Sequence, residues 1–141
     1  MISIKSTLKN VKILHLAFLF TVPLFLLQLH LLHPAEHGVS NTVIFGFGAA
    51  CLLDIVIASR FRDRMIAPSK ELLRANPEDT AALNRWRAGS IISFTYAETI
   101  VLFGFALKVL GAGWNIAGIF FVVGILLLLA WTPRLDLRQT L

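Results

Sequence analysis

One carboxylate stands out among the side chains that could do chemistry. Glu98 lies near the middle of an apolar run from residue 89 to residue 110, where an ionised acid costs about 2.5–3.5 kcal/mol on insertion scales. The residues three, four and seven positions away share its helix face, and only Thr95 among them can offer a hydrogen bond. Intramembrane acids usually belong to proton or ion pathways. We therefore expect Glu98 to handle a proton or an ion; the alternative is a protonated structural group bonded to Thr95 or to a neighbouring helix.

Asp54 is a second acid inside an apolar run, residues 42 to 59. It lies six residues before Arg60, so we expect it to lie nearer the cytoplasmic surface than Glu98. Structural pairing with cations on the Arg60 side is the simpler interpretation. The alternative is a second step of a proton path that includes Glu98.

Three of the four histidines gather at the end of the first apolar run. His30, His33 and His37 would share a helix face by their spacing, although Pro34 interrupts the helix before the third of them. Haem ligation inside a bundle needs histidines on facing helices, and the other three runs contain none. A cofactor here would need a partner chain, and an interfacial polar cluster is the simpler interpretation. We predict no cofactor and no metal site.

Four apolar helices must position these side chains. The chain has 141 residues, of which 57% are apolar and 15% are charged, against about 45–50% and 25% in soluble domains. Apolar runs of about 17–25 residues are typical of transmembrane helices. We predict an all-α polytopic membrane protein, with residues 1–141 forming one domain, a bundle of four spans. The spans cover residues 13–33, 42–59, 89–110 and 114–131, with a loop over residues 60–88.

The basic residues predict the orientation of these spans. Twelve of the thirteen lie before the first span, in the loop 60–88 or after the last span, and only Lys108 lies near the other side. By the positive-inside rule, both termini and the loop are cytoplasmic, which suits a bacterial inner membrane. This accounts for the net charge of +5 without nucleic acid, and the same cations can touch anionic headgroups. The twelve are Lys5, Lys9, Lys12, Arg60, Arg62, Arg64, Lys70, Arg74, Arg85, Arg87, Arg134 and Arg138.

Two local signals predict helix starts within the segment 60–88. Ser69 follows Pro68 and is a plausible cap for a short surface helix. The sequence from Asn76 to Asp79 combines a cap residue, a proline and two acids, which is typical of a helix start. We expect this second helix to continue without a break into the third span.

The stretch from Arg74 to Leu107 resembles the rotor-ring c subunit (proteolipid) of F- and V-type ATP synthases. That family has a helical hairpin with a basic-Asn/Gln-Pro element in its cytoplasmic loop and a carboxylate in an Ala-Glu-x-x-x-x-aromatic-Gly context. The resemblance covers about a quarter of the chain, and the second span here lacks the family's run of alternating glycines. It implies that the carboxylate carries the proton and that the loop contacts a cytoplasmic partner. The corresponding residues are Arg74, Asn76, Pro77 and Glu98, followed by Phe103-Gly104.

These observations favour two functions. The first is a small membrane subunit of a larger energy-transducing or transport complex, in which Glu98 handles a proton or an ion. The alternative is a structural accessory subunit that stabilises larger partners and transports nothing. The expected partners are membrane lipids and other membrane subunits or a second copy. A free-standing enzyme is the weakest interpretation, because so few polar groups converge.

Overall fold

Four α-helices make up the described part of the chain. The computed structural model describes residues 4–135; residues 1–3 and 136–141, which include Arg138, lie outside the described residues. The all-α prediction is confirmed. Three helices are long and apolar enough to cross a membrane, which indicates a membrane-embedded protein, and the fourth is a shorter apolar helix of 17 residues. In chain order the helices are α1 (Ile4–Leu32), α2 (Asn41–Ala75), α3 (Thr80–Val109) and α4 (Trp114–Ala130).

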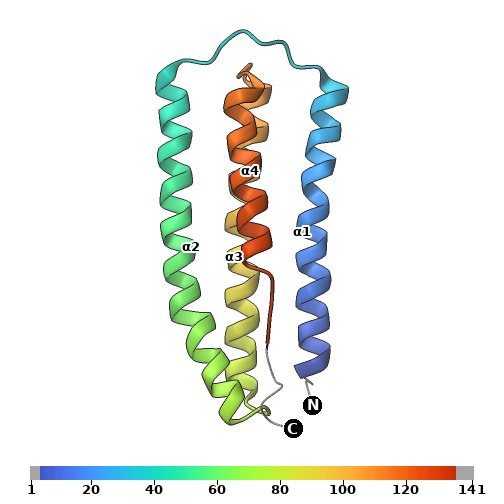
Figure 1. The fold of residues 1–141 in the computed structure, drawn as a ribbon, viewed down its shortest axis with the longest axis vertical. Coiled ribbons are helices and arrows are strands. Elements are labelled where there is room, and N and C mark those ends of the chain that lie inside the picture. Colours follow the sequence, from blue (N-terminus) through green and yellow to red (C-terminus); the bar gives the residue numbers. More distant parts are fainter. Residues whose placement is uncertain (1–3, 136–141) are drawn as a thin grey trace.

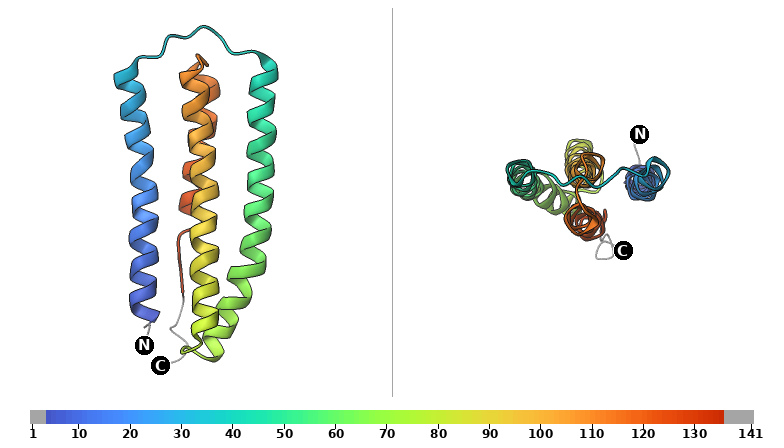
Figure 2. Two further views of the ribbon diagram at one scale, coloured as in Figure 1. Left: turned by 180° about the vertical axis from the view of Figure 1, so that it is seen from behind. Right: turned by 90° about the horizontal axis from the view of Figure 1, so that it is seen from above.

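The third helix is the centre of the fold. α3 packs against all three other helices, α1 also touches α4, and α2 touches only α3. Figure 1 shows α4 lying in front of α3, with α1 and α2 on opposite sides. The view from above in Figure 2 shows the same arrangement, and its left panel shows that the side of α3 away from α4 is flanked by α1 and α2 but crossed by neither. α3 therefore has one face that no other helix covers.

The two ends of the molecule differ in the segments that lie there. At the terminal end, the described chain begins and residues 76–79 connect α2 to α3; at the loop end, residues 33–40 connect α1 to α2 and residues 110–113 connect α3 to α4.

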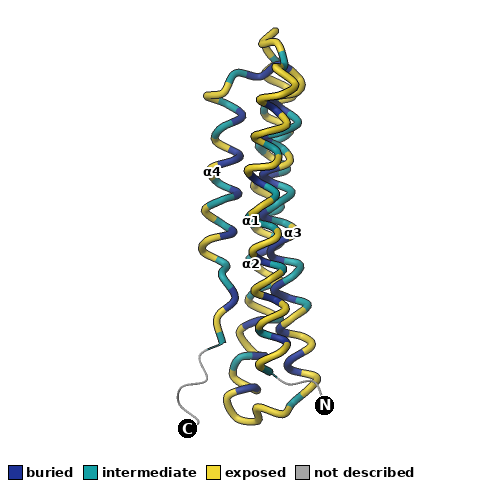
Figure 3. The backbone as a smooth tube through the Cα atoms, turned by 90° about the vertical axis from the view of Figure 1, so that its right-hand side faces the viewer, coloured by how far each residue is buried: buried dark blue, intermediate teal, exposed yellow. Residues whose placement is uncertain are grey.

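Exposed positions run along every helix (Figure 3), and many carry large apolar side chains such as Phe20, Phe45 and Leu52. An outer surface of this kind suits lipid or another membrane subunit.

Small residues bring α3 and α4 together. A Cβ atom added to Gly104 of α3 would lie 2.9 Å from the Ala117 carbonyl oxygen of α4. One added to Gly124 of α4 would lie 3.0 Å from the Ala97 carbonyl oxygen of α3. Close approach through small residues is a usual way for helices to associate where lipid supplies no hydrophobic drive. This contact fixes α4 over one side of α3.

The first part of the expected loop, residues 60–75, is part of α2, and its last part, residues 80–88, belongs to α3. α2 runs unbroken from Asn41 through Pro68 to Ala75, so no separate helix begins at Ser69. The Ser69 hydroxyl lies inside the helix and donates a hydrogen bond to the Met65 carbonyl, at 2.6 Å. Pro68 lacks a backbone N–H, and α2 bends toward α3 in this lower part (Figure 1).

The start of α3 lies slightly later than the sequence predicts. Asp79, rather than Asn76, is the N-cap, and its carboxylate accepts a hydrogen bond of 2.9 Å from the Ala82 N–H. Asn76 instead ends α2, where its backbone N–H bonds to the Leu72 carbonyl. α3 then continues without a break to Val109, so the prediction of one uninterrupted helix into the third apolar run is confirmed.

Candidate functional site

Glu98 lies at the edge of the uncovered face of α3, since Phe94 and Val101, which share its helix face, are fully buried. Its side chain is half-buried, while Thr95 and Leu102, which share its face at offsets of three and four, are exposed. Within residues 4–135, Glu98 makes neither a hydrogen bond nor an ion pair. The Thr95 hydroxyl donates to the Ile91 carbonyl at 3.1 Å instead, so the bond to Thr95 that the alternative interpretation of Glu98 suggested is not formed. The carboxylate is thus presented to whatever lies against this face.

Asp54 lies at nearly the same depth as Glu98. The rings of Phe47 on α2 and Phe103 on α3 are in contact, with centroids 5.3 Å apart, which fixes the register of the two antiparallel helices. At 1.5 Å per residue, Asp54 is about 10 Å along α2 from this contact, and Glu98 is about 7.5 Å along α3 in the same direction. The structure therefore brings both predicted acids to one level of the molecule, on separate helices.

Asp54 does not have the pairing that its sequence position suggests. Its side chain is half-buried, and among the described residues it forms no ion pair with Arg60 or with any other cation. It lies three residues after Cys51, which packs with Ile100 of α3 in one cluster of buried side chains. Asp54 is therefore at the contact between α2 and α3.

Hydroxyl groups lie at the same level as the two acids, but their hydrogen bonds are formed within their own helices. Thr99 donates to the Thr95 carbonyl at 2.9 Å. On α1, Thr21 lies between Phe18 and Phe25, whose rings contact α3 on either side of Glu98, and its hydroxyl donates to the Phe18 carbonyl at 2.6 Å. These hydroxyls form no chain between the acids in this arrangement.

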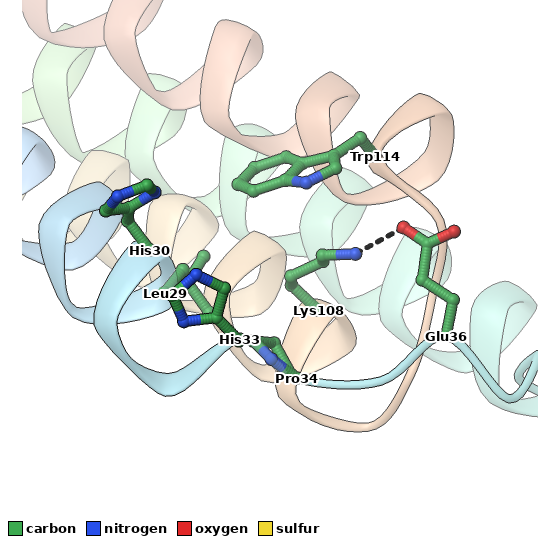
Figure 4. Close-up of a pocket in the computed structure, with 7 residues that line it drawn as sticks. All are labelled: Leu29, His30, His33, Pro34, Glu36, Lys108 and Trp114. Carbon is green, nitrogen blue, oxygen red and sulfur yellow. Dashed lines mark hydrogen bonds and ion pairs between the residues drawn. The ribbon is translucent and has the colours of Figure 1, made fainter.

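A second polar site lies at the loop end. It is a pocket of about 340 Å³ between the end of α1, the following loop, the end of α3 and the start of α4 (Figure 4). Apolar, aromatic, imidazole and charged groups all reach it. Its lining residues are Leu29, His30, His33, Pro34, Glu36, Lys108 and Trp114.

Lys108 is the centre of this pocket. Its side chain is only 4% exposed, and its ammonium group donates to Glu36 Oε1 at 2.5 Å and to the Ala112 carbonyl at 3.2 Å. The Trp114 ring covers it, with Nζ 5.1 Å from the ring centroid. Two acceptors and an aromatic face therefore compensate the buried charge.

Sequence reasoning missed this ion pair, although a signal for it exists. Lys108 is the one cation near that side of the predicted membrane, and Glu36 is the one acid in the two loops there. A lone buried cation and a lone acid at the same end are natural partners. Their separation of 72 positions hides the pairing until the connections between helices are known.

The histidine cluster is only partly assembled. The rings of His30 and His33 lie 5.3 Å apart and line the pocket. α1 ends at Leu32, and His33 takes a left-handed conformation with φ of 44°, so the exposed His37 leaves the shared face. No group of three or more potential ligands is placed to hold a metal ion within residues 4–135.

The fourth histidine has a structural contact. His15 is buried, its Nε2 donates to the Leu128 carbonyl of α4 at 2.8 Å, and its ring lies against Phe94. This bond ties α1 to α4 across the interior. His15 therefore does not face His30 or His33 across a cofactor site.

The residues of the loop element lie at the terminal end. Arg74 is in the last turn of α2, and Asn76 and Pro77 are in the connection to α3. All three side chains are exposed. They are accessible to a partner, and the first half of α3 separates them from Glu98.

No family model, curated protein or solved structure matches this chain. Its function must therefore be inferred from the placement of its own residues. Those that combine an unusual position with chemical capacity are Glu98, Asp54 and the Lys108 pocket.

Proposed function

We propose that this chain is a small multi-pass subunit of a larger energy-transducing or transport complex in a bacterial inner membrane. In this proposal all four helices span the membrane as a bundle, and the terminal end is cytoplasmic. Glu98 handles a proton or an ion where α3 meets a partner subunit. The observation that carries the proposal is a carboxylate midway along α3 that is half-buried, at the edge of an uncovered face, and without a polar partner within residues 4–135.

The energetic argument concerns what covers this face. A charged carboxylate against lipid costs about 2.5–3.5 kcal/mol or more, and intramembrane acids almost always face protein or water. Thr95 and Leu102 beside Glu98 are exposed, so the chain alone supplies neither. A neighbouring subunit with a cation or a water-filled half-channel would supply what Glu98 lacks.

A second acid at the same depth supports a role in ion handling. Asp54 on α2 and Glu98 on α3 are level to within about one helical turn. A proton or a cation that reaches this level of the molecule would find two acceptors, one on each helix. The exposed Arg74, Asn76 and Pro77 offer a separate contact for a cytoplasmic partner.

One observation favours the accessory function instead. The hydroxyls of Thr95 and Thr99 both donate to backbone carbonyls of α3. They therefore add no relay between the acids, and the face could serve as a plain packing surface with Glu98 bonded to a partner's backbone or side chain.

Mutation of the carboxylate separates the two functions. In membrane vesicles that contain the native complex, we expect Glu98→Gln to abolish proton or ion flux while the complex still assembles, because glutamine keeps the shape but cannot ionise. Glu98→Asp should retain part of the flux. Glu78→Gln is a matched control, since Glu78 is an exposed acid of the α2–α3 connection.

Unchanged flux in Glu98→Gln would eliminate the ion-handling role. If the accessory role holds, deleting the protein should lower the yield of the complex and leave its specific turnover intact. Purification in mild detergent, with identification of the co-migrating chains, names the partner. A closed ring of identical copies in native mass measurement would support the proteolipid resemblance, and a single copy among unlike subunits would contradict it.

A further inference from the structure

Four basic side chains gather at the terminal end, from two parts of the chain that are far apart in sequence. On α2, Lys70 and Arg74 are one turn apart and Arg62 lies about two turns before Lys70, and the charges of Arg62, Arg74 and Arg134 all act on Lys70. Arg62, Lys70 and Arg74 lie on α2, while Arg134 belongs to the segment that follows α4. We call these four residues the basic cluster.

An aromatic ring lies beside the basic cluster. The guanidinium carbon of Arg62 is 5.2 Å from the centroid of the Trp131 ring, at the end of α4. Arg62 lies three residues beyond the apolar run that ends near residue 59. Tryptophan is typical of the headgroup level of a membrane. The cluster therefore begins where the apolar surface of the molecule ends.

The charges of the cluster are poorly compensated within the chain. Arg62 and Lys70 are half-buried, and none of the four cations forms an ion pair with a carboxylate in the described part of the protein. The pKa of Lys70 is lowered by burial and then by its three cationic neighbours. The pKa of Arg62 is also lowered by burial, and the adjacent Asp63 opposes that effect. Asp63 and Glu71 adjoin members of the cluster in sequence, so four cations beside two acids leave a net positive site.

We propose that the basic cluster binds the phosphate headgroup of an anionic phospholipid, with Trp131 at the level of the acyl-chain boundary. Arginines bind phosphate through paired N–H donors, and lysine adds a compact positive charge. Basic pockets between helices on the cytoplasmic side are typical sites for anionic headgroups. The apolar surface and Trp131 directly beside the cations favour a lipid over a soluble anion. This inference does not depend on Glu98.

The test uses the full chain purified in a neutral maltoside detergent. We expect added phosphatidylglycerol to raise Tm by several degrees, whereas phosphatidylcholine leaves Tm unchanged. The double variant Arg62→Gln/Arg134→Gln should lose most of this rise. Arg85→Gln/Arg87→Gln is the matched control, because it removes the same charge from two exposed arginines of α3 that do not act on Lys70, and it should keep the full rise.

Three results would overturn the proposal. Equal losses in the two double variants would show general attraction to charge rather than a site. An equal rise in Tm with inorganic phosphate at the same concentration would assign the cluster to a free anion. The absence of any rise, together with loss of a co-purifying protein in Arg62→Gln/Arg134→Gln, would assign it to an acidic partner segment.

A second measurement keeps the test decisive if the double variant folds poorly. Arg62→Lys/Arg134→Lys preserves the charge and should retain phosphatidylglycerol with reduced occupancy in native mass spectra. Lys70→Gln should raise Tm in neutral detergent, because it removes a repelled charge, and should shrink the rise that phosphatidylglycerol produces. A larger rise in Lys70→Gln than in the native chain would contradict the assignment of Lys70 to the site.

Discussion

Glu98 and Lys108 are ten residues apart on the same helix, and their surroundings differ completely. Lys108 is buried, bonded to Glu36 and the Ala112 carbonyl, and covered by the Trp114 ring. Glu98 is half-exposed and has no polar partner among the described residues. The same helix thus carries one ionisable group, Lys108, whose charge the fold compensates, and another, Glu98, that has no polar partner among residues 4–135.

The difference separates a structural charge from an available one. The bonds of Lys108 join α3 to both connections at the loop end, so its charge helps to hold those segments in place. Removing Glu98 would break no hydrogen bond or ion pair among residues 4–135. In the proposed function, a partner outside the chain supplies what this carboxylate lacks. The basic cluster at the terminal end is comparable, because its cations also lack carboxylate partners in the described part of the protein.

The largest expected effect is on the packing that covers Lys108. Gly104 lies one helical turn before Lys108, and a Cβ there would lie 2.9 Å from both the Ala117 carbonyl oxygen and the Phe121 ring. We expect Gly104→Val to destabilise the protein by about 3 kcal/mol, the upper part of the usual range for overpacking. Thermal unfolding in mild detergent measures this.

Gly118→Ala serves as the control for this substitution. Gly118 is on α4, the helix that Gly104 faces, and an added Cβ would meet nothing within 4 Å. Its Tm should stay close to that of the native chain. If Gly104→Val proves as stable as Gly118→Ala, then α4 does not pack against α3 as described, and the covering of Lys108 is wrong.

The second prediction compares the two partners of the ion pair. Glu36→Gln leaves the buried ammonium of Lys108 without its carboxylate, and we expect a loss of about 1.5–3 kcal/mol, the range for hydrogen bonds to charged groups. Because Glu36 is 54% exposed, the lower part of that range is more appropriate. Lys108→Met should cost less, since it removes the buried charge and keeps the volume.

The double variant Glu36→Gln/Lys108→Met completes this comparison. Its stability should resemble that of Lys108→Met, because the glutamine then faces no unpaired ammonium. Additive losses in the double variant would mean that the two side chains do not interact. Unfolding in detergent at constant pH and salt measures all four proteins.

The sequence predicts the helices of this fold better than it predicts their extents. Hydropathy locates the apolar part of α2 but stops near residue 59, because Arg60, Arg62 and Arg64 are charged. The helix continues to Ala75, since Ile66, Ser69 and Leu73 recur at helical spacing and are buried. A search for this stripe below the apolar run would have extended the prediction.

The candidate site shows a different limit. Glu98 and Asp54 are recognisable in the sequence as acids in apolar runs, but their common depth depends on the contact between Phe47 and Phe103. The partner of Lys108 likewise lies in another connection of the chain. Periodicity and composition describe single helices, whereas these relations arise from how the helices pack together.

The third prediction concerns Glu98, which has no polar partner among residues 4–135. Glu98→Leu should leave the isolated chain as stable as the native protein or more stable, with a change below about 1 kcal/mol, because no internal bond is lost. Unfolding in the same detergent as for Glu36→Gln checks this. A loss of 2 kcal/mol or more, on the order of a broken charged hydrogen bond, would show that Glu98 has a partner within the chain and would remove the contrast with Lys108.

The smallest expected effect is a pH dependence at Lys70. Burial and the charges of Arg62, Arg74 and Arg134 lower its pKa, so the folded protein binds the proton less tightly than the unfolded chain, whose lysines titrate near about 10.4. The charged form therefore destabilises the fold at neutral pH, and this penalty disappears as pH rises from the lowered pKa through about 10.4. Because Lys70 is only partly buried, the penalty should stay below about 1 kcal/mol. In neutral detergent Lys70→Gln should accordingly have a slightly higher Tm than the native chain at pH 7, and the difference should shrink toward pH 10. A difference that grows with pH would mean that Lys70 gains a compensating carboxylate on folding, and the terminal end would then resemble the Lys108 site rather than contrast with it.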